Sequence, residues 1–208
     1  HSDSRHPRIR TCTVHIYNNY YDGNSKYGVG VTLGASAFVE ANYFRNCKFP
    51  MLISEQGSDV MEDWETLTRN EDYGTFSSEN GGIIKAYNNY IEGAKSYVTY
   101  QENSTEFDAY EASSREEEVP SEVVAYQGGA TYNNFDTSDI MYSYTVDDPE
   151  TAKEKVETYA GRENGGDFDW EFDNDTDDTD SGDGGKSDGG KGEDPAKPEV
   201  DIPVENIT

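Results

Sequence analysis

The amino-acid sequence predicts an all-β fold: a parallel β-helix, built as a solenoid of short strands, with one short helix near its end and an acidic tail. Two observations lead to this prediction. Asn-aromatic segments recur along the chain, and a short β-branched or alternating run precedes each of them. Gly, Asn and β-branched residues dominate the intervals, which disfavours helical repeats, and no Leu-x-x-Leu-x-Leu pattern of a leucine-rich solenoid is present.

The repeat is carried by four asparagines, which are separated by 23, 47 and 45 residues: Asn19, Asn42, Asn89 and Asn134. Because two of these gaps are close to twice the first, the spacing predicts coils of about 23 residues, with some turns disguised by insertions. Asparagine at equivalent turns can adopt left-handed backbone geometry and stack its amide on the next coil. We therefore expect these asparagines to belong to the scaffold.

Short strands are expected immediately before these turns, over residues 13–16, 37–39, 82–85 and 123–125. Along them, the expected inward positions are Val14, Ile16, Ile83 and Val124. The hydrophobic fraction of the chain is only 33%, but its 16 Tyr and 8 Phe can supply large buried areas beside this core.

Two stretches interrupt the repeat. Residues 54–82 are polar with scattered aromatic side chains, and residues 101–121 are acidic. Insertions in a solenoid usually form loops on one side of it and often shape the binding face. We therefore expect both stretches to be loops.

A short helix is predicted after the last coil. Asp148 suits the N-cap and Pro149 the first helical position. Ala152, Val156 and Tyr159 follow at helical spacing, and Gly161 suits the helix end. Since solenoids need their ends covered, we expect this helix to cover the open end.

Composition separates two regions and excludes some partners. Residues 1–172 are expected to form the β-helix domain, and residues 173–208, rich in Asp and Gly, a disordered acidic linker or tail. With a formal net charge of −27, the chain is unsuited to bind nucleic acid. No hydrophobic run is long enough to span a membrane, and we expect a monomer. The two cysteines, Cys12 and Cys47, are too few for a disulfide framework, and their pairing stays open.

The one dense positive cluster of this acidic chain lies near its start, where Arg5, Arg8 and Arg10 run into an alternating strand. Guanidinium groups bind planar carboxylates or phosphates through two parallel N–H bonds; ion pairs with neighbouring acids are the plainer alternative. Arg5 and Arg10 would face opposite sides of a regular strand. Pro7 predicts a bend that lets both project into one groove.

The residues of this motif and its continuation resemble the pectate lyases of polysaccharide lyase family 1. The resemblance covers about residues 3–172 and rests on Arg5-x-Pro7-x-x-Arg10, the segment 14–20 and the segment 40–44. It implies a right-handed parallel β-helix and calcium-dependent β-elimination in α-1,4-linked polygalacturonate. It also implies a location outside the cell, either secreted, periplasmic or at the cell surface.

The resemblance also implies roles for the arginines. Arg5 corresponds to the base that takes the proton from C5 of a galacturonate unit, and Arg10 to the cation that pairs with the substrate carboxylate. Cations against that carboxylate stabilise the negative charge that develops when the proton leaves. Arg8 is a further substrate-binding candidate; for it and for His6, a structural ion pair or cap is an equal alternative. His15 is expected to be a scaffold residue.

The calcium ligands of the family lie before the arginine motif, and this chain begins at His1. We therefore expect the chain to be the C-terminal part of a catalytic domain, with Ca²⁺ ligands upstream of His1, no metal ligand within it, and no activity on its own. Two alternatives stay open: a non-catalytic β-helix that binds acidic polysaccharide, and a calcium-independent pectin lyase that acts on the methyl-esterified polymer.

Overall fold

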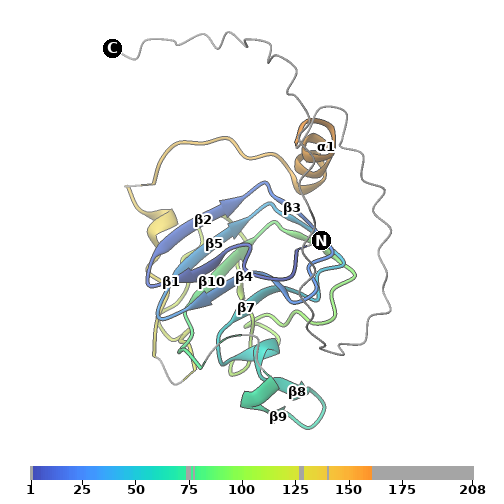
Figure 1. Ribbon diagram of the computed structural model, residues 1–208. Helices are drawn as coiled ribbons and strands as arrows, with labels where there is room; N and C mark the ends of the chain where they lie inside the picture. The colour runs from blue at the N-terminus through green and yellow to red at the C-terminus, as the bar shows by residue number, and fades with distance from the viewer. Residues whose placement is uncertain (1, 74–75, 77, 127–128, 140, 161–208) are drawn as a thin grey trace, which may run out of the picture. The chain divides into compact units, whose positions relative to one another are not determined.

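The computed structural model describes residues 2–73, 76, 78–126, 129–139 and 141–160 (Figure 1). Within them, the chain winds through three sheets in which all neighbouring strands are parallel. This arrangement confirms the predicted parallel β-helix. The predicted acidic tail, the boundary at residue 172 and the helix end at Gly161 lie outside the described residues.

Each of the first three coils contributes one strand to each sheet, and the next coil adds a strand to the second sheet alone. The first sheet has the order β1 (Arg8–Arg10), β4 (Tyr27–Thr32), β7 (Phe49–Ile53). The second has the order β2 (Thr13–Tyr17), β5 (Ser36–Glu40), β10 (Ile83–Tyr87), β12 (Tyr110–Glu111). The third has the order β3 (Tyr20–Asp22), β6 (Tyr43–Arg45), β11 (Tyr90–Glu92).

Smaller elements lie in the loops between these strands. They are an antiparallel pair, β8 (Met61–Asp63) with β9 (Thr68–Arg69), and the 3₁₀ turns η1 (Gly57–Asp59), η2 (Glu71–Tyr73) and η3 (Phe135–Thr137). The β8–β9 hairpin extends away from the three sheets (Figure 1).

The long gap between Asn42 and Asn89 is one enlarged coil, not two coils. β10 pairs directly with β5, with Ile83 opposite Ser36, so residues 54–82 form an excursion between β7 and β10 of the same coil. The prediction of a loop there is confirmed, but the near-doubling of the period is a coincidence. Pairing between coils sets the register of a solenoid, whereas the length of a loop between two strands is free.

The predicted asparagine ladder exists at three of its four positions. Asn19 Nδ2 donates to Asn42 Oδ1 at 2.9 Å, and Asn42 Nδ2 donates to Asn89 Oδ1 at 3.0 Å. The left-handed geometry belongs to the residue before each of them: Asn18 (φ 52°), Ala41 (φ 49°) and Asn88 (φ 52°). Amide stacking and left-handed turning are thus divided between adjacent residues.

The placement of Asn134 in this ladder is wrong. Asn134 is the N-cap of η3, and its side chain exchanges hydrogen bonds with the backbone of Val119. The Oδ1 atom accepts from Val119 N at 2.8 Å, and Nδ2 donates to Val119 O at 3.1 Å. The amide therefore closes a loop instead of joining two coils.

Three of the four predicted strands are confirmed as β2, β5 and β10. The strand at 123–125 is wrong, because this segment makes only an isolated antiparallel bridge between Val124 and Thr131. Val124 is 43% exposed, while Val123 and Ala125 are buried, so the predicted inward side is reversed there. Ile16 and Ile83 lie in the core as predicted, and Val14 is half-buried against it.

The predicted helix is α1 (Pro149–Tyr159), and Asp148 is its N-cap, with Oδ1 accepting from Thr151 N at 2.9 Å. Its predicted position is wrong. Instead of covering the open end of the solenoid, α1 contacts β3 and β6 of the third sheet (Figure 1). Lys153 Nζ lies 4.8 Å from the ring centroid of Tyr43, which belongs to the outer face of that sheet. None of the described helices is long and apolar enough to cross a membrane.

Candidate active site

Alternation along β1 places two of the three arginines on the outer face of the first sheet. Ile9 is buried in the core, so Arg8 and Arg10 point to the opposite side. The parallel register sets Arg8 beside Gly30 and Arg10 beside Thr32 of β4. Both guanidinium groups therefore lie over the same two strands.

Arg5 precedes the strand and has an unusual backbone. Its φ of 71° lies in the left-handed region, which non-glycine residues seldom adopt. The following His6–Pro7 peptide bond is cis. The segment is held along β4, because His6 N donates to Gly28 O and Gly30 N donates to Pro7 O, each at 2.9 Å. The Arg5 side chain is exposed, and Nη1 lies 3.1 Å from Ser4 Oγ.

The carboxylate of Glu79, from the excursion 54–82, lies against both strand arginines. It accepts from Arg8 Nη2 at 2.6 Å and from Arg10 Nε at 3.0 Å, and its second oxygen pairs with Arg10 Nη2. Thr32 Oγ1 donates to it at 3.1 Å. Sequence reasoning missed Glu79, because a glutamate in a polar stretch without periodicity carries no signal of its partners in β1.

An aromatic cluster of Tyr27 and Phe76 covers Arg8 more than Arg10. The Phe76 ring stacks on Tyr27 at 5.0 Å between centroids, and the Arg8 guanidinium lies 5.2 Å from the Phe76 centroid. Gly30 makes this approach possible, since a Cβ there would lie 2.5 Å from Phe76 Cζ. The side chain of Arg8 is 14% exposed and that of Arg10 is 53% exposed. Arg10 and Arg5 are thus open to a ligand, while Arg8 lies beneath the cluster.

The hydroxyl of Tyr27 is close to these charges. Burial raises the pKa of Tyr27, and the positive charges of Arg5 and Arg8 oppose that shift. The positive charges of Arg5 and Arg8 thus both act on this buried hydroxyl.

The other candidates have structural surroundings. His15 Nε2 lies 3.0 Å from Glu40 Oε2, and its ring stacks between Tyr17 and Phe38, so the expected scaffold role fits. His6 Nε2 lies 2.5 Å from Ser2 Oγ. Cys12 and Cys47 are both free. In the described part of the chain, no group of three or more His, Cys, Asp or Glu is arranged to hold a metal ion.

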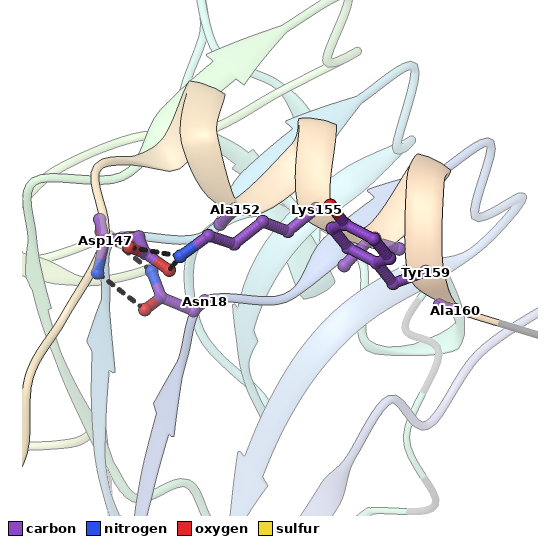
Figure 2. A pocket seen from close by; sticks show the side chains of 7 residues that line it. Asn18, Asp147, Ala152, Lys155, Tyr159 and Ala160 are labelled. Atoms are coloured by element: carbon purple, nitrogen blue, oxygen red, sulfur yellow. Dashed lines mark hydrogen bonds and ion pairs between the residues drawn. The ribbon is translucent and has the colours of Figure 1, made fainter.

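A hollow lies beside α1 and is lined by residues of this helix together with Asn18 and Asp147 (Figure 2). Its polar side chains bind one another: Lys155 Nζ lies 2.7 and 2.6 Å from the two carboxylate oxygens of Asp147. Asn18 Oδ1 accepts from Asp147 N at 2.8 Å, and Asn18 Nδ2 donates to Asp147 O at 2.8 Å. These contacts join α1 to the first turn of the ladder, which is a structural role.

The family model described as pectate lyase matches residues 2–165. Pectate lyase A of Emericella nidulans is 34% identical over 126 residues, which are 61% of this chain and 30% of that protein. Pectate lyase 3 of Pectobacterium atrosepticum is 25% identical over 160 residues, which are 76% of this chain and 33% of that protein. The crystal structure of a pectate lyase from Bacillus sp. N165 in complex with trigalacturonate aligns with 76% of this chain and 36% of its own, at a TM-score of 0.40 and 22% identity.

The chain spans about a third of the length of the curated relatives it matches. The family match nevertheless extends over most of the chain, from before the arginines to beyond α1. The chain belongs to the pectate lyase family.

Proposed function

We propose that this chain is part of a pectate lyase that cleaves α-1,4-linked polygalacturonate outside the cell by calcium-dependent β-elimination. Family membership and the names of the relatives support this reaction class. The observation that carries the proposal is the position of Arg10. Its guanidinium is half open on the outer face of the first sheet, beside Arg8 and just after the exposed Arg5, in a chain of net charge −27.

The chemistry assigns a task to each arginine. Arg5, reacting as the neutral guanidine, is the base that takes the C5 proton and becomes a guanidinium; the electrons of the C5–H bond form the C4–C5 double bond, and the C4–O bond breaks. The departing sugar keeps the bridging oxygen, which takes a proton from water. Arg10 pairs with the carboxylate on C5, where negative charge develops as the proton leaves. Arg8 adds its charge to that binding from beneath Phe76.

Calcium would add further positive charge at the substrate carboxylate. The described residues contain no cluster of metal-binding side chains, so its ligands belong to another part of the protein in this proposal. The roles of the three arginines above involve only side chains of this chain.

Substitution of Arg5 tests the proposal in the protein that contains this chain. Arg5→Lys should lower kcat at least ~10²-fold with near-normal affinity for polygalacturonate, because a base acts only in the transition state. Arg10→Lys should cost ~2–4 kcal/mol in kcat/KM, since lysine cannot form two parallel bonds to a carboxylate. The measurement is the absorbance of unsaturated uronides.

Arg45→Lys is the matched control, because Arg45 pairs with Asp22 on the third sheet, away from the arginine motif. It should leave kcat/KM unchanged. A collapse of affinity at constant kcat in Arg5→Lys would make Arg5 a carboxylate clamp instead of a base. Binding without product formation would favour the non-catalytic β-helix, and chelator-insensitive cleavage of methyl-esterified polymer would favour the pectin lyase.

A further inference from the structure

Arg10 presents only one of its two binding edges to solvent. Its Nε and Nη2 atoms both face the Glu79 carboxylate, a side-on arrangement that uses two of the five guanidinium N–H groups. The end edge, with one N–H on each Nη, remains, and the side chain is 53% exposed. The geometry therefore leaves a second pair of N–H donors with which Arg10 can bind a carboxylate.

Glu79 is not a side chain that can swing away easily. The residues after it are joined to the turn that follows β4: Leu33 N donates to Asn80 O at 2.6 Å, and Gly34 N donates to Gly81 O at 2.8 Å. Thr32 Oγ1 lies 3.1 Å from the Glu79 carboxylate and 2.9 Å from Asn80 O, and its single hydroxyl proton is shared between these two acceptors. The backbone next to Glu79 is therefore fixed on the turn after β4, and displacing the Glu79 side chain would break its contacts with Thr32, Arg8 and Arg10.

The charges of Arg8, Arg10 and Glu79 also favour a fixed position for the Glu79 side chain. Arg8 and Arg10 stand two residues apart on one face of one strand, where two guanidinium groups repel each other. One carboxylate oxygen of Glu79 accepts from both of them, and the whole side chain is only 17% exposed. The negative charge of Glu79 thus offsets the repulsion between the two guanidinium groups and keeps them close to each other.

We infer that Glu79 is a positioning residue of the proposed lyase reaction: it fixes the Arg10 guanidinium so that its free edge takes the substrate carboxylate. The inference rests on the proposed function. A glutamate that instead competed with substrate for Arg10 would weaken binding, so the two roles predict opposite changes in KM.

The test compares Glu79→Gln with wild type in the protein that contains this chain. Glutamine keeps the shape but loses the charge, so Arg10 loses its side-on pair; we expect KM for polygalacturonate to rise about 10-fold and kcat to fall about 10-fold. Glu79→Asp should recover part of both effects. Glu65→Gln, an exposed glutamate of the same excursion, should leave both constants unchanged.

A double-mutant cycle separates positioning from a purely structural role. In an Arg10→Lys background, Glu79→Gln should add less than about 3-fold, because its effect passes through Arg10. Full additivity, or a loss of urea stability with unchanged KM and kcat, overturns the inference. A lower KM in Glu79→Gln overturns it as well and identifies Glu79 as a competitor.

A separate measurement distinguishes failure of the proposed function from failure of the inference about Glu79. If the wild type releases no unsaturated uronide, the lyase proposal fails, and the same variants are compared for trigalacturonate affinity by calorimetry. Affinity about 10-fold weaker in Glu79→Gln, with no further loss in the Arg10→Lys background, still supports positioning. A wild type that neither cleaves nor binds overturns both proposals.

Discussion

The residue beside the arginines with the least expected surroundings is Tyr27. Its side chain is 1% exposed, and its hydroxyl has no hydrogen-bond partner among the residues that the structure describes. The ring itself is well packed in the small apolar cluster with Phe49, Leu52 and Phe76. A buried hydroxyl without a hydrogen-bond partner costs about 1–3 kcal/mol of folding free energy. The Tyr27 ring therefore stabilises the folded state, whereas its hydroxyl destabilises it.

Tyr27→Phe should therefore stabilise the protein by ~1 kcal/mol, since it removes the oxygen and keeps the ring. Urea unfolding measures the change. The matched control is Tyr132→Phe, which should destabilise the protein, because the buried Tyr132 hydroxyl donates to Asp136 Oδ1 at 2.7 Å. A less stable Tyr27→Phe variant, or one that loses lyase activity at full stability, would show that the hydroxyl has a partner in the working protein.

At the scale of elements, the asparagine ladder joins the turns between the second and third sheets. Asn42 is its centre and is completely buried. The two N–H groups of its Nδ2 are shared among Ile16 O, Glu40 O and Asn89 Oδ1 at 2.9–3.0 Å, and its Oδ1 accepts from the backbone and side chain of Asn19 at 2.9 Å. One side chain thus satisfies polar groups of three successive coils.

Asn42→Ala should cost ~2–4 kcal/mol of unfolding free energy, because it leaves buried partners in the coils on both sides without hydrogen bonds. Asn19→Ala should cost only ~1 kcal/mol, because Asn19 is the exposed end of the ladder and water can replace its bonds. Chemical denaturation of both variants checks the order. Equal losses would mean that the ladder adds nothing beyond the individual turns.

At the scale of the whole molecule, buried carboxylates tie the excursion 54–82 to residues that follow β11. Asp108 accepts from Ser58 N at 2.7 Å, from Ser58 Oγ at 2.6 Å and from Val98 N at 2.9 Å. Glu106 accepts from Gly57 N at 3.0 Å and pairs with Arg69. The two interruptions of the repeat are therefore packed on each other at η1.

Burial raises the pKa of Asp108 to about 7, although the hydrogen bonds from Ser58 and Val98 oppose this shift. The folded state then holds the proton more tightly than the unfolded state, in which the pKa is near 3.8. The contribution of Asp108 to stability is therefore fully present below pH ~4 and is lost as the pH rises to ~7.

Asp108→Asn should remove this part of the pH dependence of the unfolding free energy between pH ~4 and ~7. Asp63→Asn is the control, since hydrogen bonds from Thr66 and Glu65 lower the pKa of this carboxyl, which then titrates below that window. Urea unfolding at several pH values measures the slope. An Asp108→Asn slope equal to that of the wild type would contradict the assignment.

Local signals in the sequence were sufficient for much of the fold. Asp148 and Pro149 define the start of α1 through contacts within one helical turn. The runs before Asn19, Asn42 and Asn89 form strands because their composition and the following turn agree. The same composition failed at 123–125, where the chain no longer pairs with a preceding coil and so has no neighbour to set its register.

By itself, the sequence determined the fold class, three of the four asparagine turns, the start of the helix and the cluster of three arginines, because each depends on residues close together in the chain or on a repeated pattern. Only the tertiary structure decided that the 47-residue gap is one coil, that α1 packs on β3 and β6, and that Glu79 meets Arg8 and Arg10. These features join residues tens of positions apart through loops without periodicity. Their partners are chosen by packing, charge and hydrogen bonding in the folded chain, which no local pattern encodes.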